Sequence, residues 1–326
     1  MRSSILNLLR QRSGEYLSGE EIAKQLDVSR TAVWKHMQEL KQGGYAIEAH
    51  SRRGYCFRQA PDLLLPDEVS TGLKTKFIGC KIHYFNQIDS TNNEAKKIAA
   101  AGAAEGTVVI SEEQNGGRGR LSRGWFSPEN LGIWMSIILR PPFNPQDAPK
   151  CTLLAAVAIA KAIRQVTNVN CGIKWPNDIL YDGKKLVGIL TEMSAEMDAI
   201  NHIVIGMGIN VNITENEFPD ELKDIATSLR VIVGEPISRV KLLQEILSQL
   251  EELYMSAIKN GFPEILDDWR KYSVTLGQTV NVIGINTQFS GVAVDIDEDG
   301  ALLVETENGK QKVIAGDVSI RPKQTS

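Results

Sequence analysis

The sequence predicts a multidomain α+β protein, because three stretches of the chain carry three different patterns of apolar residues. Short helical patterns come first, a mixture of strand and helix patterns follows, and a run of short strands ends the chain. A length of 326 residues is enough for two or three domains. We expect a first domain at residues 1–65, a central domain at 66–272 and a last domain at 273–326.

The net charge of −4 is distributed unevenly. Residues 1–60 hold ten basic and six acidic side chains, whereas the remainder of the chain carries a net charge of −8. A basic first domain on an acidic body indicates a local contact with a polyanion. There is no apolar run of about 20 residues, as a membrane span requires, and no secretory signal. We therefore expect a cytoplasmic protein without membrane contact. The four cysteines lack zinc-ligand spacing.

The first domain is predicted to contain a helix-turn-helix. Ser18 and Ser29 each precede a helical pattern as N-caps. In the second pattern, Val33, Met37 and Leu40 recur at the spacing of one buried helix face. The second helix of such a motif enters the major groove of DNA.

Residues 45–57 form a predicted β-hairpin with a basic tip, which is a wing. The alternative is a helical hairpin for protein contacts with solvated arginines. The caps, the polar helix face and the wing together favour DNA binding, and we expect Trp34 to pack inside the domain. The residues expected to contact DNA are Ser29, Arg30, Thr31, Lys35, Gln38, Arg52 and Arg53.

The central domain is predicted to be a mostly antiparallel sheet with helices. Asp182-Gly183 is a strong hairpin signal between two strand patterns. Strands are expected at residues 81–85, 106–111, 132–139, 172–175, 179–181, 185–193 and 203–212, and helices at 93–101, 152–166 and 238–258.

Residues 116–125 alternate glycines with three arginines and end in a tryptophan. Glycine is unfavourable inside helices and strands, so this segment is predicted to be a loop. Glycines let the backbone approach a ligand, and arginine supplies forked donors for carboxylate or phosphate. The loop is therefore a candidate anion clamp; a solvated basic turn and a nucleic-acid patch are the alternatives.

Lys185 begins a strand and is predicted to share a face with Val187 and Ile189. It either faces a bound anion or extends to water. Two glycine pairs, at 117–119 and 206–208, begin a dinucleotide fingerprint but lack its third glycine, so neither is a Rossmann turn.

The last domain is predicted to be a small β-barrel that packs on the body of the protein. Asp299-Gly300 is a hairpin turn. Its expected strands are residues 279–283, 291–296, 301–305 and 312–315.

Several motifs together resemble those of bifunctional biotin–protein ligases that are also biotin operon repressors. They are Gly-Arg-Gly-Arg at 117–120, Lys-Trp-Pro-Asn-Asp at 174–178, Lys-Leu-Val-Gly-Ile-Leu at 185–190, Gly-x-Gly-Ile-Asn-Val at 206–211, and Asp-Ser-Thr-Asn at 89–92. The resemblance covers nearly all of the chain. It implies a winged helix-turn-helix, a biotin/lipoate ligase-like central sheet and an SH3-like C-terminal barrel.

The resemblance also implies a reaction in two steps. Biotin and MgATP give biotinyl-5′-AMP and pyrophosphate, and a lysine of a biotin carboxyl carrier domain then takes the biotin. The ligands of Mg²⁺ are not indicated by the sequence. The implied partners are the carrier domains of biotin-dependent carboxylases, biotin operator DNA, and a second copy of the chain when biotinyl-AMP is bound.

The family's functional residues carry over onto matching positions. The resemblance makes Lys185, Arg118 and Arg120 catalytic. It assigns biotin and the adenylate to Ser90, Thr91, Asn92, Gln114, Arg118, Gly119, Arg120 and Lys185, and the nucleotide to Arg123, Trp125, Asn177, Asp178 and Asn210. One departure is Leu121-Ser122, which stands where the family often has Arg-Gly.

Two other functions fit parts of the sequence. A lipoate–protein ligase shares the implied fold and chemistry, but the helix-turn-helix and the Arg/Gly loop favour biotin. A metabolite-sensing repressor without catalysis would not need Arg118, Arg120 and Lys185 together. A carrier protein is excluded, because no Met-Lys-Met acceptor sequence occurs.

Overall fold

The structure is a computed structural model that describes residues 1–196, 199–284, 288–314 and 318–322. The chain divides into two compact units, Met1–Leu63 and Leu64–Ser326. The second unit contains both the central sheet and the C-terminal sheet, so the expected boundary at residue 272 stays a prediction. None of the helices in the described ranges is long and apolar enough to cross a membrane.

The first unit is a winged helix-turn-helix, as the sequence predicts. Ser18 Oγ accepts a hydrogen bond from the Glu21 amide at 3.0 Å, and Ser29 Oγ accepts one from the Ala32 amide at 3.1 Å. Both expected N-caps are therefore confirmed. The elements are α1 (Arg2–Gln11), β1 (Tyr16–Leu17), α2 (Gly19–Gln25), α3 (Arg30–Gln42), β2 (Ala46–His50) and β3 (Gly54–Gln59), with the strands in the order β1-β3-β2.

The wing is the hairpin of β2 and β3, and its tip is held by a histidine. His50 Nδ1 accepts hydrogen bonds from the amides of Arg52 and Arg53, each at 3.2 Å. The Arg53 guanidinium also lies 4.1 Å from the centre of the Tyr16 ring, a cation–π distance. Arg53 is therefore attached to the body of the unit, whereas Arg52 extends from the tip.

The expected packing role of Trp34 is wrong. Its side chain is 57% exposed, although Val33, Met37 and Leu40 of the same helix are almost fully buried. The physical reason is helical spacing, because residue 34 falls outside the stripe that those three residues form.

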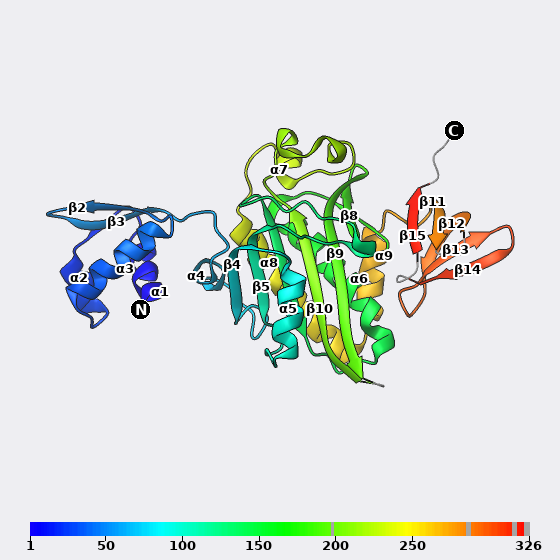
Figure 1. Cartoon of the computed structure of the whole chain (residues 1–326), viewed down its shortest axis with the longest axis horizontal. Coiled ribbons are helices and arrows are strands. Elements are labelled where there is room, and N and C mark those ends of the chain that lie inside the picture. Colours follow the sequence, from blue (N-terminus) through cyan, green and yellow to red (C-terminus); the bar gives the residue numbers. More distant parts are fainter. Residues whose placement is uncertain (197–198, 285–287, 315–317, 323–326) are drawn as a thin grey trace. The chain divides into compact units, whose positions relative to one another are not determined.

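The central sheet has seven strands in the order β4-β5-β6-β10-β9-β8-β7. Only the pairing of β4 with β5 is parallel among the pairs described in this sheet, so the mixed, mostly antiparallel sheet is confirmed. Figure 1 shows the strands side by side with helices on both faces. The strands are β4 (Ile82–Ile88), β5 (Val108–Gln114), β6 (Gly132–Leu139), β7 (Gly172–Lys174), β8 (Asp178–Tyr181), β9 (Lys184–Glu196) and β10 (Ala199–Asn210).

Alternation along β10 separates two faces of this sheet. One face packs on α6 and α8, where Ile205 and Ile209 join the large apolar core. The other face carries Val204, which packs against Ala95 and Ala99 of α5. The helices of the unit are α4 (Pro66–Ser70), α5 (Thr91–Ala100), α6 (Ala148–Thr167), α7 (Leu229–Val233), α8 (Arg239–Asn260) and α9 (Pro263–Tyr272). The short α4 and α7, together with α9, were not predicted.

The C-terminal strands form a five-stranded sheet in the order β14-β13-β12-β11-β15. This small antiparallel sheet is the SH3-like part that the sequence predicts. The expected strand at 312–315 is observed as β14, and its last expected residue, Ala315, lies outside the described residues. The strands are β11 (Thr279–Gly284), β12 (Gln288–Ile296), β13 (Leu302–Thr306), β14 (Gly309–Val313) and β15 (Val318–Pro322).

A buried ion pair anchors the start of the second unit. Arg239 Nη1 lies 2.7 Å from Glu112 Oε2, and the two side chains are 0% and 2% exposed. The other oxygen of Glu112 accepts a hydrogen bond from the Leu64 amide at 2.7 Å. One carboxylate therefore links the first residue of the unit to β5 and α8.

Candidate functional site

A cavity of about 820 Å³ lies on the face of the central sheet that α5 partly covers. This volume suits a ligand the size of a nucleotide or a cofactor. All thirteen residues that the sequence analysis assigns to ligands line it: Ser90, Thr91, Asn92, Gln114, Arg118, Gly119, Arg120, Arg123, Trp125, Asn177, Asp178, Lys185 and Asn210. The structure brings these residues together, and their individual roles stay predictions.

The floor of the cavity is made of glycines on β9 and β10. A Cβ atom at Gly188 would lie 2.7 Å from the Trp125 ring. One at Gly208 would overlap the indole nitrogen of Trp125, and one at Gly206 would overlap the Asn92 amide. These glycines let other groups approach the backbone of the sheet, which is the usual reason for glycine inside a strand.

One end of the cavity is lined by neutral polar groups. Gln114 Oε1 accepts hydrogen bonds from the amide and the hydroxyl of Thr91, at 2.9 and 3.1 Å. The buried Ser136 hydroxyl lies 2.8 Å from Thr91 Oγ1 and 2.5 Å from Asn92 Oδ1. Ser90, the N-cap of α5, is also buried here. This end therefore offers fixed donors and acceptors without a net charge.

The amide of Asn92 is oriented by a carboxylate on β9. Asn92 Nδ2 donates to Glu192 Oε2 at 2.9 Å, and Lys96 Nζ lies 2.6 Å from the other oxygen of Glu192. Burial raises the pKa of Glu192, but the hydrogen bonds from Lys96 and Asn92 outweigh burial and hold that pKa below its usual range. Glu192 is thus kept as an acceptor, and it fixes the direction of the Asn92 amide.

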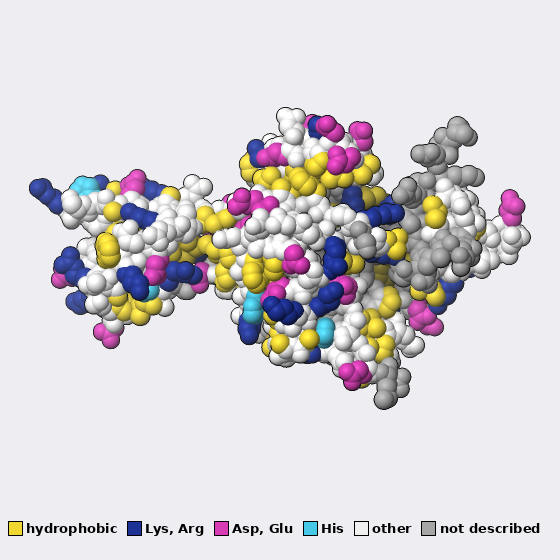
Figure 2. Space-filling model, in the orientation of Figure 1, with side chains coloured by type: hydrophobic (Ala, Val, Ile, Leu, Met, Phe, Trp, Pro, Cys, Tyr) yellow, Lys and Arg dark blue, Asp and Glu magenta, His cyan; other side chains and the backbone are white. Residues whose placement is uncertain are grey.

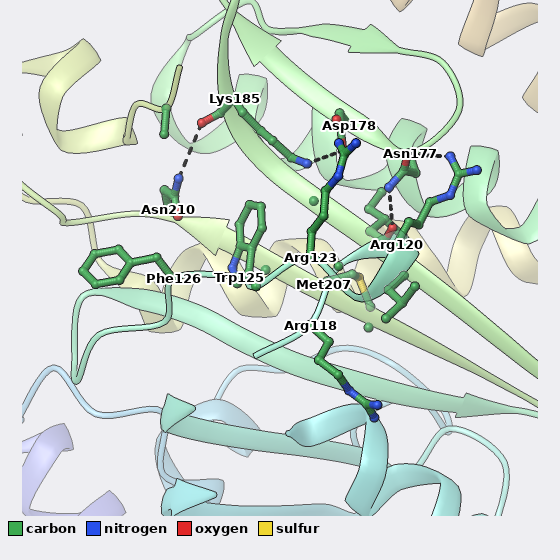
Figure 3. Close-up of a pocket in the computed structure, with 18 of the residues that line it drawn as sticks. Arg118, Arg120, Arg123, Trp125, Phe126, Asn177, Asp178, Lys185, Met207 and Asn210 are labelled. Carbon is green, nitrogen blue, oxygen red and sulfur yellow. Dashed lines mark hydrogen bonds and ion pairs between the residues drawn. The ribbon is translucent and has the colours of Figure 1, made fainter. Parts of the chain in front are cut away.

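The middle of the cavity holds an ion pair. Lys185 Nζ lies 2.7 Å from Asp178 Oδ1, and the Lys185 side chain is 35% exposed (Figure 3). The cation is therefore neutralised in the absence of ligand but remains accessible to one. Asp178 leads into β8, and Lys185 follows the β8–β9 turn, so the predicted Asp182-Gly183 hairpin brings the two together.

The expected face of Lys185 is wrong. The pairing of β8 with β9 shifts by one residue at Leu186, which is a β-bulge. A bulge reverses the alternation of side chains. As a result Lys185 lies on the glycine side of β9, with its amine 5.2 Å from the Trp125 ring centre, while Val187 is buried in the opposite core.

Trp125 lies across the glycine floor in this structure. Its ring packs on Gly188 and Gly208, and the Lys185 amine lies 5.2 Å from the centre of the ring (Figure 3). The indole Nε1 is buried and has no hydrogen-bond partner among the described residues. A buried donor of this kind is unfavourable, so the position favours replacement of the ring by a ligand or its movement onto one.

The Arg/Gly loop folds back on itself as a small hairpin. The Gly119 amide donates to the Arg123 carbonyl at 2.7 Å, and Arg118 pairs with Gly124 in a β-bridge. Arg118 points away from Lys185 and donates to Asn93 of α5 (Figure 3). Leu121, one of the two residues that depart from the family pattern, is 68% exposed and has a φ of 54°. That conformation is unfavourable for any residue with a Cβ atom, so the loop tip is strained at Leu121.

The segment at 174–178 is held by hydrogen bonds at both ends. Asn177 Nδ2 donates to the Ile189 carbonyl at 2.8 Å and its oxygen accepts from Arg120 at 3.3 Å. The Trp175 indole donates to the Gly300 carbonyl at 3.0 Å, in the turn between β12 and β13. The C-terminal sheet therefore supports the wall of the cavity that carries Asn177.

Asn210 closes the far end of the cavity floor. Its side-chain nitrogen donates to the Thr227 carbonyl at 3.0 Å. The Lys185 amide in turn donates to the Ile225 carbonyl at 2.8 Å. These contacts attach the segment before α7 to the strand that carries Lys185.

Several lining residues were not predicted from the sequence. Gly188 lies within the motif at 185–190. The period-two spacing of Gly206 and Gly208 could have predicted a strand face without side chains. Phe218 and Ile225 also line the cavity, but they come from irregular segments and gave no periodic signal. Among the described residues, no group of three His, Cys, Asp or Glu side chains is placed to hold a metal.

Comparison with known proteins gives the same picture as the geometry. Residues 2–56 match a family described as HTH domain, residues 84–210 the Biotin/lipoate A/B protein ligase family, and residues 275–321 the Biotin protein ligase C terminal domain. The Bacillus subtilis protein named Bifunctional ligase/repressor BirA is 44% identical over 98% of this chain and 98% of its own length. The Escherichia coli protein of the same name is 28% identical over 95% of this chain and 94% of its own.

Solved structures agree with these relatives. Biotin protein ligase from Aquifex aeolicus, in complex with biotin and ATP, has a TM-score of 0.66 at 28% identity and covers 75% of this chain and 100% of its own. The fold and the cavity define an adenylate-forming protein ligase joined to a DNA-binding domain. The chain belongs to the family of bifunctional biotin–protein ligases and repressors. It is therefore a biotin–protein ligase with a repressor's helix-turn-helix.

Proposed function

We propose that the cavity makes biotinyl-5′-AMP at Lys185 and transfers biotin to a carrier domain. The observation that carries the proposal is the partly exposed Lys185–Asp178 ion pair, because it places an accessible cation between a neutral polar end and an arginine-rich loop. Biotin has an uncharged ring system and a carboxylate tail, and ATP brings phosphates. These chemical parts match the three parts of the cavity.

The neutral end suits the biotin ring system. Thr91 donates to Gln114, and Asn92 is held by Ser136 and Glu192, so the remaining donors and acceptors of these side chains have fixed directions. Preorganised polar groups lose little entropy when a ligand binds. Ser90, the N-cap of α5, completes this end.

In the first step, an oxygen of the biotin carboxylate attacks the α-phosphorus of MgATP. A new oxygen–phosphorus bond forms, the bond to the β-phosphate oxygen breaks, and pyrophosphate leaves with its Mg²⁺. Lys185 and Arg120 neutralise the carboxylate and the phosphate and stabilise charge that develops during the attack. Arg118, which bonds Asn93, holds the loop that carries Arg120. Asp178 releases Lys185 when the anions arrive.

The nucleotide is expected to meet Trp125, Arg123, Asn177 and Asn210. Trp125 rests against the glycine floor, and its ring would stack on adenine when the nucleotide binds. Gly119 lets the Arg/Gly loop bend over the product. Water would hydrolyse the mixed anhydride, so closure of this loop protects it.

In the second step, the amine of a carrier lysine attacks the acyl carbon of biotinyl-AMP. An amide bond forms, the bond between that carbon and the phosphate oxygen breaks, and AMP leaves while the amine gives up its proton. The carrier domains of biotin-dependent carboxylases are the substrates that this chemistry requires.

Single-turnover pyrophosphate release tests the proposal. Purified protein with MgATP and biotin should release one pyrophosphate per chain, and a carrier domain should then become biotinylated. The same mixture with lipoate should release none. Pyrophosphate release with lipoate and not with biotin would overturn the proposal in favour of a lipoate–protein ligase, and release with neither would leave a sensor without catalysis.

The adenylate is also proposed to control the repressor. A helix-turn-helix reads one half-site, so tight operator binding requires two copies at a spacing of about 34–36 Å. Ordering of the cavity loops by biotinyl-AMP lowers the cost of forming a homodimer, which makes the adenylate a corepressor. Sedimentation and mobility-shift assays with and without biotin and ATP test this. Equal operator affinity in both conditions would rule out the biotin switch.

A further inference from the structure

The exposure of the tryptophan of α3 is explained neither by the packing of the first unit nor by the ligase reaction. Trp34 is 57% exposed, and the core of the unit is complete without it, because Val33, Met37 and Leu40 fill the buried face of the helix. Leaving so large an apolar side chain in water is unfavourable, and such a residue commonly marks a contact surface.

The neighbours of Trp34 define the class of partner. Residues three and four apart share one face of a helix, so Thr31, Arg30 and Gln38 surround the indole, and Lys35 lies beside it. Arg30, Thr31 and Lys35 are exposed. Figure 2 shows basic side chains gathered on this unit. The surface is thus an apolar centre within a polar and cationic rim, which suits DNA rather than an apolar protein face.

The position along the helix narrows the contact to base edges. Trp34 is the fifth of the thirteen residues of α3, and the N-terminal half of a recognition helix is the part that reaches bases in the major groove. Ser29 caps the same end, with its hydroxyl oxygen already accepting the Ala32 amide. Ser29 therefore orients the helix, and the indole projects one turn further along.

The chemistry of the major groove supplies one apolar group, the C5-methyl of thymine. We propose that Trp34 is a specificity residue that packs its indole on thymine methyl groups of the operator. Arg30 and Gln38 are placed to bond base edges on either side, and Lys35 neutralises phosphate. The inference rests on the operator binding of the family and adds the base that this residue recognises.

The experiment uses full-length protein with biotin and MgATP. A duplex is first selected from random DNA by the wild-type protein. Each thymine in its half-sites is then replaced by deoxyuridine, which removes only the methyl group. Binding of wild type, Trp34→Ala, Trp34→Phe and Lys35→Ala is measured on both duplexes and on a random duplex.

The expected pattern separates a methyl contact from general loss of affinity. Trp34→Ala should weaken binding to the selected duplex about 10–100-fold and binding to random DNA hardly at all, and Trp34→Phe should keep part of the affinity. At one thymine position of the half-site, replacement by deoxyuridine should weaken binding of the wild-type protein and leave binding of Trp34→Ala unchanged. Lys35→Ala should weaken binding to the selected duplex and to the random duplex by the same factor. It should also reduce the slope of log affinity against log salt concentration by about one.

Two results would overturn the inference. One is equal affinity of wild type for the thymine and deoxyuridine duplexes at every position. The other is a Trp34→Ala variant that loses selected and random DNA equally. Unchanged carrier biotinylation and circular dichroism show that each variant is folded. If the wild-type protein selects no duplex at all, operator binding itself is disproved. That result differs from either of the two above, so failure of the operator proposal can be told apart from failure of the Trp34 contact.

Discussion

Lys185 is the residue whose surroundings fit a change of partner during the reaction. Its amine is 2.7 Å from Asp178 and 5.2 Å from the Trp125 ring centre, and it lies on the bare face of β9. In the proposed mechanism, it leaves Asp178 for the carboxylate and phosphate of the reactants. Its contribution should therefore be larger in the transition state than in the resting protein.

We predict that Lys185→Ala slows adenylate formation by about 10²–10³-fold, the usual effect of removing one preorganised charge donor. Single-turnover release of pyrophosphate measures it. The matched control is Lys184→Ala, because Lys184 is adjacent in sequence but bonds the Lys223 carbonyl outside the cavity. A Lys185→Ala protein that releases pyrophosphate as fast as the control would disprove the role.

At the scale of elements, the Glu112–Arg239 pair joins β5, α8 and the start of the second unit. Both side chains are buried, so removal of one leaves an uncompensated charge in the core. We predict that Arg239→Met lowers the free energy of unfolding of this unit by about 3–5 kcal/mol. Urea unfolding followed by tryptophan fluorescence measures the change.

The control for that prediction is an ion pair at the surface. Lys271 is 72% exposed and pairs with Asp268 at 2.8 Å. Lys271→Met should cost less than about 1 kcal/mol, because solvent screens exposed pairs. Equal losses for Arg239→Met and Lys271→Met would mean that Glu112 tolerates the absence of its partner.

The Arg/Gly loop is the second element with a testable role. Arg118 ties the loop to Asn93 of α5, and that attachment is expected to hold the loop over the adenylate. We predict that Arg118→Gly forms biotinyl-AMP but releases it early, so that lysines of bystander proteins become biotinylated. Streptavidin blots of a reaction with added albumin measure this. Labelling confined to the carrier domain would contradict the clamp.

Much of the site could be predicted because its residues lie in short motifs beside clear strand signals. The Asp182-Gly183 turn fixes the β8–β9 hairpin, and that hairpin brings together the two strands that carry Asp178 and Lys185. The caps at Ser18 and Ser29 marked the starts of α2 and α3 by the same local logic. Local chemistry of this kind does not depend on the tertiary fold.

The rest depends on packing that sequence patterns do not encode. The bulge at Leu186 changes the face of the sheet on which Lys185 lies, and the alternation of residues along β9 does not predict that bulge. The two-residue strand β1 is too short to show a period. The helix α9 does carry one, because Ile265, Leu266 and Trp269 lie on one buried helical face, so its pattern was available in the sequence and was overlooked. Trp34 was assigned to the core by its residue type, although the spacing of Val33, Met37 and Leu40 in the sequence already places residue 34 outside the buried stripe of α3.

At the scale of the whole molecule, the two compact units should act separately in the ligase reaction. We predict that removing residues 1–63 leaves carrier biotinylation intact and abolishes operator binding. The cut keeps Leu64, since its amide bonds Glu112 inside the second unit. Biotinylation of a carrier domain and a mobility shift measure the two activities. A truncated protein that folds but cannot biotinylate would show that the first unit takes part in catalysis.

The glycine floor limits how the ligand preference of this enzyme can change. Gly188, Gly206 and Gly208 already carry the smallest possible side chain, so every substitution there makes the cavity shallower. Acceptance of a bulkier biotin analogue must therefore come from the opposite wall, where Trp125 and Phe218 can be trimmed. Variants with new substrates should therefore carry substitutions in the wall formed by Trp125 and Phe218. Substitutions at the glycines of the floor can only exclude ligands.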